Sequence, residues 1–269
     1  QEGVIDDFEL IDAVNMSKKK VQLIVNDFDI KDKIYDGTTS ASITIDITDG
    51  RIVAEHSALL EVVASGNFAR KQTGKNIAID VSVATLQIKN SLSQEQYDLA
   101  LEAIDNYELV QYKGTITGNI EARPVLVSAD LGTREYNGDE AVAKSGISYE
   151  LRNMIEGDIK YYAIQTKNGA YFDDKNVAAE IDTQGNVIKV NAKGGTAYGL
   201  LLQNIKERYD NYTLVYSSNS EIAGKEALAY VLKDGTIVYE KPLASVEVTE
   251  YWYALETTRY YVAATNENS

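Results

Sequence analysis

Apolar and polar residues alternate along much of this 269-residue chain. Alternation with a period of two is typical of strands that bury one face. Turn residues separate these runs, and each run is eight to fourteen residues long. The pattern therefore predicts a mainly β fold, with short strands stacked as immunoglobulin-like sandwiches. The runs lie at residues 21–30, 40–48, 76–89, 125–132 and 185–192.

Two segments have apolar residues at helical spacing instead. In residues 93–107, a helix would place Tyr97, Leu101 and Ile104 on one face, and Ser93 to Gln96 fits a capping box. Residues 196–212 carry Leu201, Ile205 and Tyr209 at the same spacing. The sequence thus predicts one short helical insertion for each of two sandwiches.

An internal repeat organises the chain. Tyr35-Asp36-Gly37 and Tyr136-Asn137-Gly138 lie 101 residues apart, and Phe68 and Phe172 lie 104 apart. The closing motifs, Asp105–Leu109 and Asp210–Leu214, lie 105 apart. Three landmarks with one order and nearly one spacing predict tandem domains. The predicted parts are an N-terminal segment (1–20), a first repeat (21–121), a second repeat (122–224) and a partial third repeat (225–269).

The short motifs each predict a local structure. Glycine and asparagine tolerate a positive φ, so each Tyr-Asp/Asn-Gly triplet predicts a tight turn. In the closing motif, Asn106 and Asn211 suit a left-handed turn. Tyr107 and Tyr212 follow them and precede alternating runs, so we expect both rings to be buried.

These landmarks resemble the YDG repeat domain of large bacterial surface proteins and adhesins. The first copy has Tyr35-Asp36-Gly37-Thr38-Thr39, and the second has Gly157-Asp158 and Phe172 followed by Asp173 to Val177. Both copies have the closing Asn-Tyr-x-Leu, and the resemblance covers residues 21 to 224. It implies immunoglobulin-like sandwiches in tandem arrays, a spacer or adhesive role at the bacterial cell surface, and no catalytic residues.

Composition narrows the classes of function. The net charge of −15 would repel a nucleic-acid backbone, so we expect no nucleic-acid partner. No apolar run is long enough for a membrane-spanning helix, so we expect no membrane insertion. The absence of cysteine excludes disulfides and thiolate chemistry. A first residue of Gln1 is expected of a mature or excised fragment.

Candidate catalytic groups are few. His56 is the single histidine, no nucleophile-elbow motif occurs, and residues 193–199 lack the ending of a phosphate loop. Composition does not exclude a catalytic pair of carboxylates, because the chain contains 41 Asp and Glu residues. We expect no enzyme activity.

Calcium is the cofactor for which the sequence offers candidates. It takes several oxygen ligands at one place, often at joints between domains. The alternative is that these carboxylates lie in solvated turns, and we predict no other cofactor. An isopeptide crosslink also stays open. The candidate ligands are Asp27, Asp29, Asp32, Asp36, Asp173 and Asp174.

Three functions follow, none of them enzymatic. The first is a passive or adhesive stalk module that contacts neighbouring repeats or a host or glycan receptor. The second is a filament subunit, in which residues 1–20, with Val4, Phe8, Leu10 and Val14, complete the open edge of 225–269 by strand exchange. The third is a carbohydrate-binding module built on the aromatic residues of 250–261, although alternate residues would face opposite sides of a strand.

Overall fold

The fold is mainly β, with 43% of residues in strands and 13% in helices, which confirms the predicted class. The structure is a computed structural model and describes residues 16–132, 135, 137–173, 178–191, 195–206, 210–255 and 261–264. The contacts divide the chain into two compact units. Unit 1 comprises residues 1–31, 40–69 and 78–118, and unit 2 comprises 32–39, 70–77 and 119–269.

This division places its main break a few residues before the predicted boundary between residues 121 and 122. The main break follows Gly118, and two short segments from the first part of the chain, 32–39 and 70–77, belong to unit 2. Unit 2 is therefore assembled from three separate stretches of sequence. Sequence periodicity does not indicate that these two segments belong to unit 2, because both keep their places in the first repeat.

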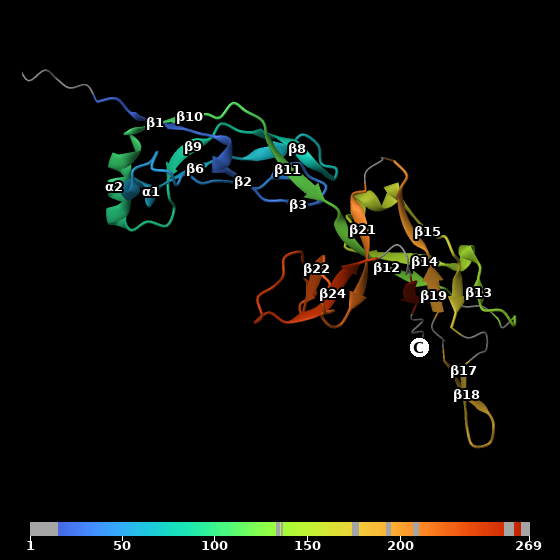
Figure 1. The fold of residues 1–269 in the computed structure, drawn as a ribbon. Coiled ribbons are helices and arrows are strands. Elements are labelled where there is room, and N and C mark those ends of the chain that lie inside the picture. Colours follow the sequence, from blue (N-terminus) through green and yellow to red (C-terminus); the bar gives the residue numbers. More distant parts are fainter. Residues whose placement is uncertain are drawn as a thin grey trace, which may run out of the picture. The chain divides into compact units, whose positions relative to one another are not determined.

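Unit 1 is built on short antiparallel strands and one parallel pair. A four-stranded sheet has the order β2-β5-β6-β9, and β1 pairs in parallel with β10 (Figure 1). Their bounds are β1 Lys19–Gln22, β2 Phe28–Ile30, β5 Ile43–Ile45, β6 Leu60–Val63, β9 Thr85–Ile88 and β10 Tyr107–Val110.

A further sheet has the order β3-β11-β8-β7-β4, and the division between the units passes through β8 and β11. Its strands are β3 Lys33–Ile34, β4 Ser40–Ala41, β7 Gly66–Phe68, β8 Gly74–Val81 and β11 Ile116–Glu121. A short 3-10 turn, η1 Val25–Asp27, interrupts the run expected at 21–30. The strand is thus split into β1 and β2.

The helix expected at residues 93–107 is present as α2 Gln94–Ile104, and its capping box is confirmed. Ser93 Oγ accepts a hydrogen bond from the Gln96 amide at 3.3 Å, and Gln96 Oε1 accepts one from the Ser93 amide at 3.0 Å. The predicted buried face is right only for Ile104, which packs against the apolar cluster of unit 1. Tyr97 and Leu101 are about half exposed, at 44% and 48%.

The face that does pack consists of small residues. Ala100 and Ala103 are buried, and they join the larger apolar cluster of unit 1 with Val21, Leu60 and Tyr107. Small side chains allow the helix backbone to approach the strands closely, which larger side chains on that face would prevent. A second short helix, α1 Ala54–Ser57, contacts β6.

Unit 2 contains a six-stranded sheet of order β14-β12-β21-β24-β22-β23 and a four-stranded sheet of order β13-β16-β19-β25. The pairs β15-β20 and β17-β18 complete it, and Figure 1 shows β17 and β18 as a separate two-stranded ribbon. The bounds are β12 Arg123–Asp130, β13 Ala141–Val142, β14 Ser148–Arg152, β15 Tyr162–Thr166, β16 Ala170–Phe172, β17 Ala178–Ile181, β18 Val187–Asn191, β19 Gly195–Tyr198, β20 Leu200–Asn204, β21 Tyr212–Ser218, β22 Ala229–Leu232, β23 Ile237–Val238, β24 Val248–Ala254 and β25 Tyr261–Ala264.

The helical insertion predicted at residues 196–212 is wrong. The segment forms β19 and β20, separated by Gly199 at φ +65°, a conformation that no α-helix contains. Leu200 is buried whereas Leu201 is 45% exposed, which is strand alternation. Ile205 is 63% exposed, and Tyr209 lies outside the described residues. Pairing of β20 with β15 over five residues outweighs the local helix propensity.

The C-terminal strands join the second repeat rather than forming a separate sheet. β24 pairs with β21, and β22 and β23 extend the sheet beyond β24. Trp252 is fully buried there and forms a cluster with Val215, Ala229 and Val231. The strands of residues 225–269, whose edge was predicted to be open, are thus paired with β21 through β24. Residues 1–15 of the predicted donor segment lie outside the described residues.

Candidate functional site

A partly buried polar cluster in unit 2 centres on the Asp158 carboxylate. Its Oδ2 accepts hydrogen bonds from the hydroxyls of Tyr35 and Tyr212, each at 2.8 Å. Tyr35 belongs to the Tyr-Asp-Gly turn, Asp158 to the 3-10 helix η3 Glu156–Tyr161, and Tyr212 opens β21. The Tyr35–Asp158 bond joins residues 123 positions apart in the sequence.

The two tyrosine rings are packed as well as hydrogen-bonded. Tyr35 is 1% exposed and Tyr212 6%, and their rings meet edge to face with centroids 5.4 Å apart. Tyr162 also packs edge to face against Tyr212, with ring centroids 5.0 Å apart. Burial, and then the hydrogen bond to Asp158, raise the pKa of Tyr212. The Tyr212 hydroxyl therefore stays protonated and serves as a donor to the carboxylate.

The same closing motif holds the other segment that unit 2 takes from the first part of the chain. Asn211 is 4% exposed, and its Oδ1 accepts a hydrogen bond from the Thr73 amide at 3.1 Å. Consecutive residues thus fix both segments: Asn211 fixes 70–77, and Tyr212, through Asp158, fixes 32–39. Gly37 also approaches this site, since a Cβ built there would lie 3.4 Å from Ile155 Cδ1.

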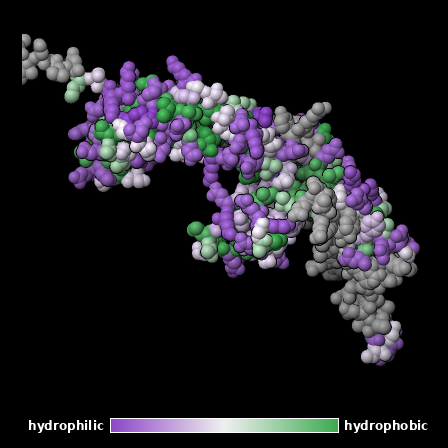
Figure 2. Space-filling model, viewed as in Figure 1, coloured by the Kyte–Doolittle hydropathy of each residue, from purple (hydrophilic) through white to green (hydrophobic). Residues whose placement is uncertain are grey.

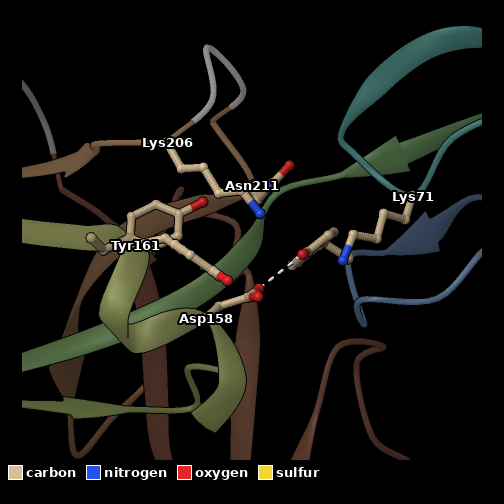
Figure 3. A pocket seen from close by; sticks show the side chains of 7 residues that line it. Lys71, Asp158, Tyr161, Lys206 and Asn211 are labelled. Atoms are coloured by element: carbon tan, nitrogen blue, oxygen red, sulfur yellow. Dashed lines mark hydrogen bonds between the residues drawn. The ribbon is translucent and has the colours of Figure 1, made fainter.

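A small cavity adjoins the carboxylate. Figure 3 shows Lys71 and Lys206 reaching it from separate segments, together with Asp158, Tyr161 and Asn211. Lys206 Nζ lies 4.3 Å from the centre of the Tyr161 ring, a cation–π contact. The pocket volume of about 30 Å³ corresponds to one or two water molecules.

Unit 1 contains a corresponding site. Tyr107, which opens β10, accepts a hydrogen bond from the Val53 amide at 3.1 Å, and Tyr212 accepts one from the Ile155 amide at 3.3 Å. Val53 and Ile155 each immediately precede a short helix. In unit 1 the place of Asp158 is taken by His56, whose Nδ1 lies 2.9 Å from the Tyr107 hydroxyl.

Strand registers relate the two sites further. Lys19 pairs with Tyr107 in the parallel pair β1-β10, and Arg123 pairs with Tyr212 in the parallel pair β12-β21. Lys19 and Arg123 lie 104 residues apart, close to the 105 residues that separate Tyr107 from Tyr212. Lys19 also donates to the Gly50 carbonyl, and Arg123 donates to that of Asn153. The two tyrosines therefore occupy equivalent positions in their units.

The two Tyr-Asp/Asn-Gly turns are alike in the residues that the structure describes. Gly37 has φ +78° and Gly138 φ +79°, which confirms the predicted turns. In the first turn Asp36 Oδ1 accepts from the Thr38 amide at 2.8 Å, and in the second Asn137 Oδ1 accepts from the Asp139 amide at 3.1 Å. Tyr136 lies outside the described residues.

The sequence predictions on the closing motif meet mixed outcomes. Tyr107 and Tyr212 are both 6% exposed, as predicted. The left-handed turn expected at Asn106 and Asn211 is wrong, since neither has a positive φ. Asn106 instead donates from Nδ2 to the Glu102 carbonyl at 3.0 Å, which satisfies a carbonyl at the end of α2.

The calcium candidates have other partners. Asp27 is 4% exposed and forms an ion pair with Arg51, with Nη1–Oδ2 at 2.9 Å. Asp36 is bonded to Lys33 at 2.8 Å; burial opposes ionisation, but the Lys33 and Thr38 hydrogen bonds outweigh it and lower the pKa of Asp36.

The remaining candidates are not gathered around a common point. Asp32 accepts a hydrogen bond from Asn119, while Asp29 and Asp173 are exposed. Asp174 lies outside the described residues. Across the part of the chain that the structure describes, no three Asp, Glu or His side chains gather as metal ligands. In that same part, no helix is long and apolar enough to cross a membrane.

Sequence reasoning missed Asp158 as a site residue, although Gly157-Asp158 was among the residues that resemble the YDG repeat. Its partner Tyr35 is too distant in sequence for any local pattern to join them. Comparison with protein-family models gives no match, and comparisons with curated proteins and with solved structures give none at a significant level. The resemblance to the YDG repeat thus stays a prediction.

Proposed function

We propose that this protein is a non-enzymatic structural or adhesive module of a bacterial cell surface, working as part of a stalk or fibre. The observation that carries the proposal is the cluster of Tyr35, Asp158 and Tyr212. It uses a carboxylate and two buried hydroxyls to fasten a distant turn of the chain. Hydrogen bonds to a charged acceptor are among the strongest that a protein can use for such a fastening.

The surroundings of Asp158 favour fastening over catalysis. A carboxylate that acts as a general acid or base must reach a substrate atom. Asp158 instead meets two tyrosines of its own unit, and the space beside it is about 30 Å³. The equivalent position in unit 1 is a histidine, so the two positions share a hydrogen-bonding role with tyrosine rather than one acid–base chemistry.

The surface agrees with an extracellular spacer. The chain carries a net charge of −15, and most of the face of unit 1 seen in Figure 2 is hydrophilic, with scattered apolar residues. A high net charge of one sign favours solubility and disfavours non-specific association. Calcium, a host receptor and a glycan partner all remain proposals beside this one.

Two experiments test the function. Brief protease treatment of intact producing cells should remove the protein while a cytoplasmic enzyme of those cells survives; full protection would contradict the location. Purified chain should leave a panel of glycans and peptides unchanged. Turnover that disappears in Asp158→Asn, while the tyrosine cluster stays folded, would overturn the non-enzymatic role.

A filament subunit is the second candidate. The observation in its favour is that Asn137 and Gly138 of the second turn are exposed, and so is Val53 beside the buried Tyr107. The carbohydrate-binding alternative has less support. Trp252 is fully buried and Tyr253 is 1% exposed, so these two rings pack in the interior instead of forming a platform for sugars.

A further inference from the structure

The first described strand of unit 1 pairs in parallel with the strand that follows the first closing motif. Among the residues that the structure describes, β1 and β10 form a two-stranded sheet of their own (Figure 1). We infer that this pair is a mechanical clamp, which keeps unit 1 folded when tension pulls on the chain from both sides. The inference rests on the proposed structural function, because a stalk or fibre transmits such tension.

The direction of the two strands sets how tension loads them. Tension along the chain pulls β1 from its start and β10 from its end. Because the strands are parallel, these points lie at opposite ends of the pair, with Lys19 beside Tyr107 at one end and Gln22 beside Val110 at the other. The strands are therefore sheared, and all the hydrogen bonds between them carry the load together. In an antiparallel pair both points would lie at one end, and the bonds would break one after another.

Backbone hydrogen bonds extend to the residues that flank the pair. The Lys19 amide donates to the Asn106 carbonyl at 2.7 Å, and the Leu23 amide donates to the Val110 carbonyl at 2.9 Å. Val21, in the middle of β1, is fully buried in the larger apolar cluster of unit 1. A slip of one residue turns each side chain of a strand to the other face. Sliding β1 along β10 therefore breaks the bonds and withdraws Val21 from the cluster.

Each strand is also held at the end away from its pull. Just after β1, Asp27 is 4% exposed and forms an ion pair with Arg51, which also donates to the Gln22 carbonyl. At the start of β10, the Tyr107 hydroxyl accepts a hydrogen bond from the Val53 amide at 3.1 Å. A pull on β1 is thus opposed at Arg51, and a pull on β10 at Tyr107, in addition to the bonds between the strands.

Unit 2 contains a parallel pair at the equivalent positions. β12 opens the second repeat and pairs in parallel with β21, which begins at Tyr212 of the second closing motif. This pair lies inside the six-stranded sheet, where β14 and β24 flank it. The elements between the paired strands differ, since the first repeat has α2 where the second has β19 and β20. The parallel direction is common to both repeats, as a load-bearing role in each repeat requires.

Pulling single molecules of the full chain in two directions tests the inference, because the chain has no cysteine and handles can be attached at introduced thiols. Ser17→Cys with Lys113→Cys shears β1 against β10. Ser17→Cys with Asp105→Cys pulls both strands from their starts and peels them apart. All three positions are exposed and lie outside the two strands. The comparison therefore changes the direction of the load and leaves the clamp intact.

The force of the first rupture at equal loading rate is the measurement. Unfolding under force follows the rate at which the loaded bonds yield, so shearing should need at least about twofold more force than peeling. Equal forces in the two directions would overturn the inference. Such a result leaves the surface location and the absence of turnover untouched, so it is distinguishable from failure of the proposed function.

Two variants of the sheared protein locate the resistance. Lys19→Pro removes the amide that donates to Asn106 and should lower the shearing force toward the peeling force. Lys19→Ala is the matched control, because it keeps that amide and loses only the side-chain bond to the Gly50 carbonyl. It should keep most of the force. Hydrogen exchange at β6 checks that unit 1 stays folded, and a folded Lys19→Pro variant with the full shearing force would also reject the clamp.

Discussion

The two tyrosine sites differ in one acceptor and in what covers them. In unit 2 Tyr212 donates to Asp158, which also holds Tyr35, whereas in unit 1 Tyr107 meets His56. The two sites share the tyrosine, its pairing in a parallel strand pair, and a backbone amide that donates to its hydroxyl. A carboxylate accepts two hydroxyls on one oxygen, and neutral imidazole accepts one. The capacity of the acceptor thus separates a site that holds a distant turn from one that closes only its own unit.

The largest expected effect is on the tyrosines themselves. Tyr107→Ala and Tyr212→Ala should each destabilise their own unit by about 3–5 kcal/mol, the usual cost of deleting a buried aromatic side chain. Trp252 is the only tryptophan and lies in unit 2, so its fluorescence during urea unfolding reports Tyr212→Ala. Hydrogen exchange at β10 reports Tyr107→Ala. A change under about 0.5 kcal/mol in either would break the equivalence of the sites.

The acceptors should differ more than the tyrosines do. Asp158→Ala leaves two buried hydroxyls without their acceptor and should cost about 2–4 kcal/mol in unit 2. His56→Ala affects one hydroxyl at a partly exposed site and should cost about 1 kcal/mol in unit 1. The measurements are those used for the tyrosine variants. Equal losses would show that the covering turn adds nothing to the Asp158 site.

A capping mutation should affect unit 1 alone. Ser93→Ala removes the side-chain acceptor of the capping box of α2 and should cost about 1 kcal/mol. The equivalent part of unit 2 is the strand pair β19 and β20, which has no helix to cap. Calorimetry should show a lower transition temperature for unit 1, while the Trp252 signal keeps its urea midpoint. Movement of that midpoint would show that the units do not respond separately.

The smallest effect concerns acid. Burial opposes ionisation of Glu250, but hydrogen bonds from Trp252, Ser217 and Arg152 outweigh it and hold its pKa below the ordinary 4.5. Its contribution is therefore present above pH 4.5 and is lost as the pH falls below that value. Glu250→Gln should flatten the acid dependence of the unit 2 urea midpoint by under about 1 kcal/mol. An unchanged pH profile would remove Glu250 from the account.

Local signals in the sequence predicted the local structure well. The glycines of the turns, the capping box at Ser93 and the burial of Tyr107 and Tyr212 each depend on a few neighbouring residues. Long-range pairing decided the errors. The second predicted helix became β20 because β15 pairs with it, and a period-3.6 and a period-2 pattern share positions in a short apolar run. The cluster at Asp158 was missed because its partner lies 123 residues away.

The face of α2 illustrates a different limit. Leu99 and Leu101 are about half exposed while Ala100 and Ala103 are buried. A hydrophobicity pattern ranks leucine above alanine, but the space between α2 and the strands decides which side chain fits. No single-sequence pattern contains that distance. The same holds for the division of the chain, in which 32–39 and 70–77 belong to unit 2.

The central claim is that Tyr35 fastens the turn at 35–37 to Asp158, and a double-mutant cycle tests it most directly. Tyr35→Phe, Asp158→Ala and the double variant are unfolded in urea while Trp252 fluorescence is followed, with Tyr171→Phe, a tyrosine 43% exposed in unit 2, as the control for Tyr35→Phe. A hydrogen bond between the two groups predicts a coupling energy of about 1–2 kcal/mol for Tyr35 with Asp158 and close to zero for the control. Additive losses for Tyr35 and Asp158 would contradict the account.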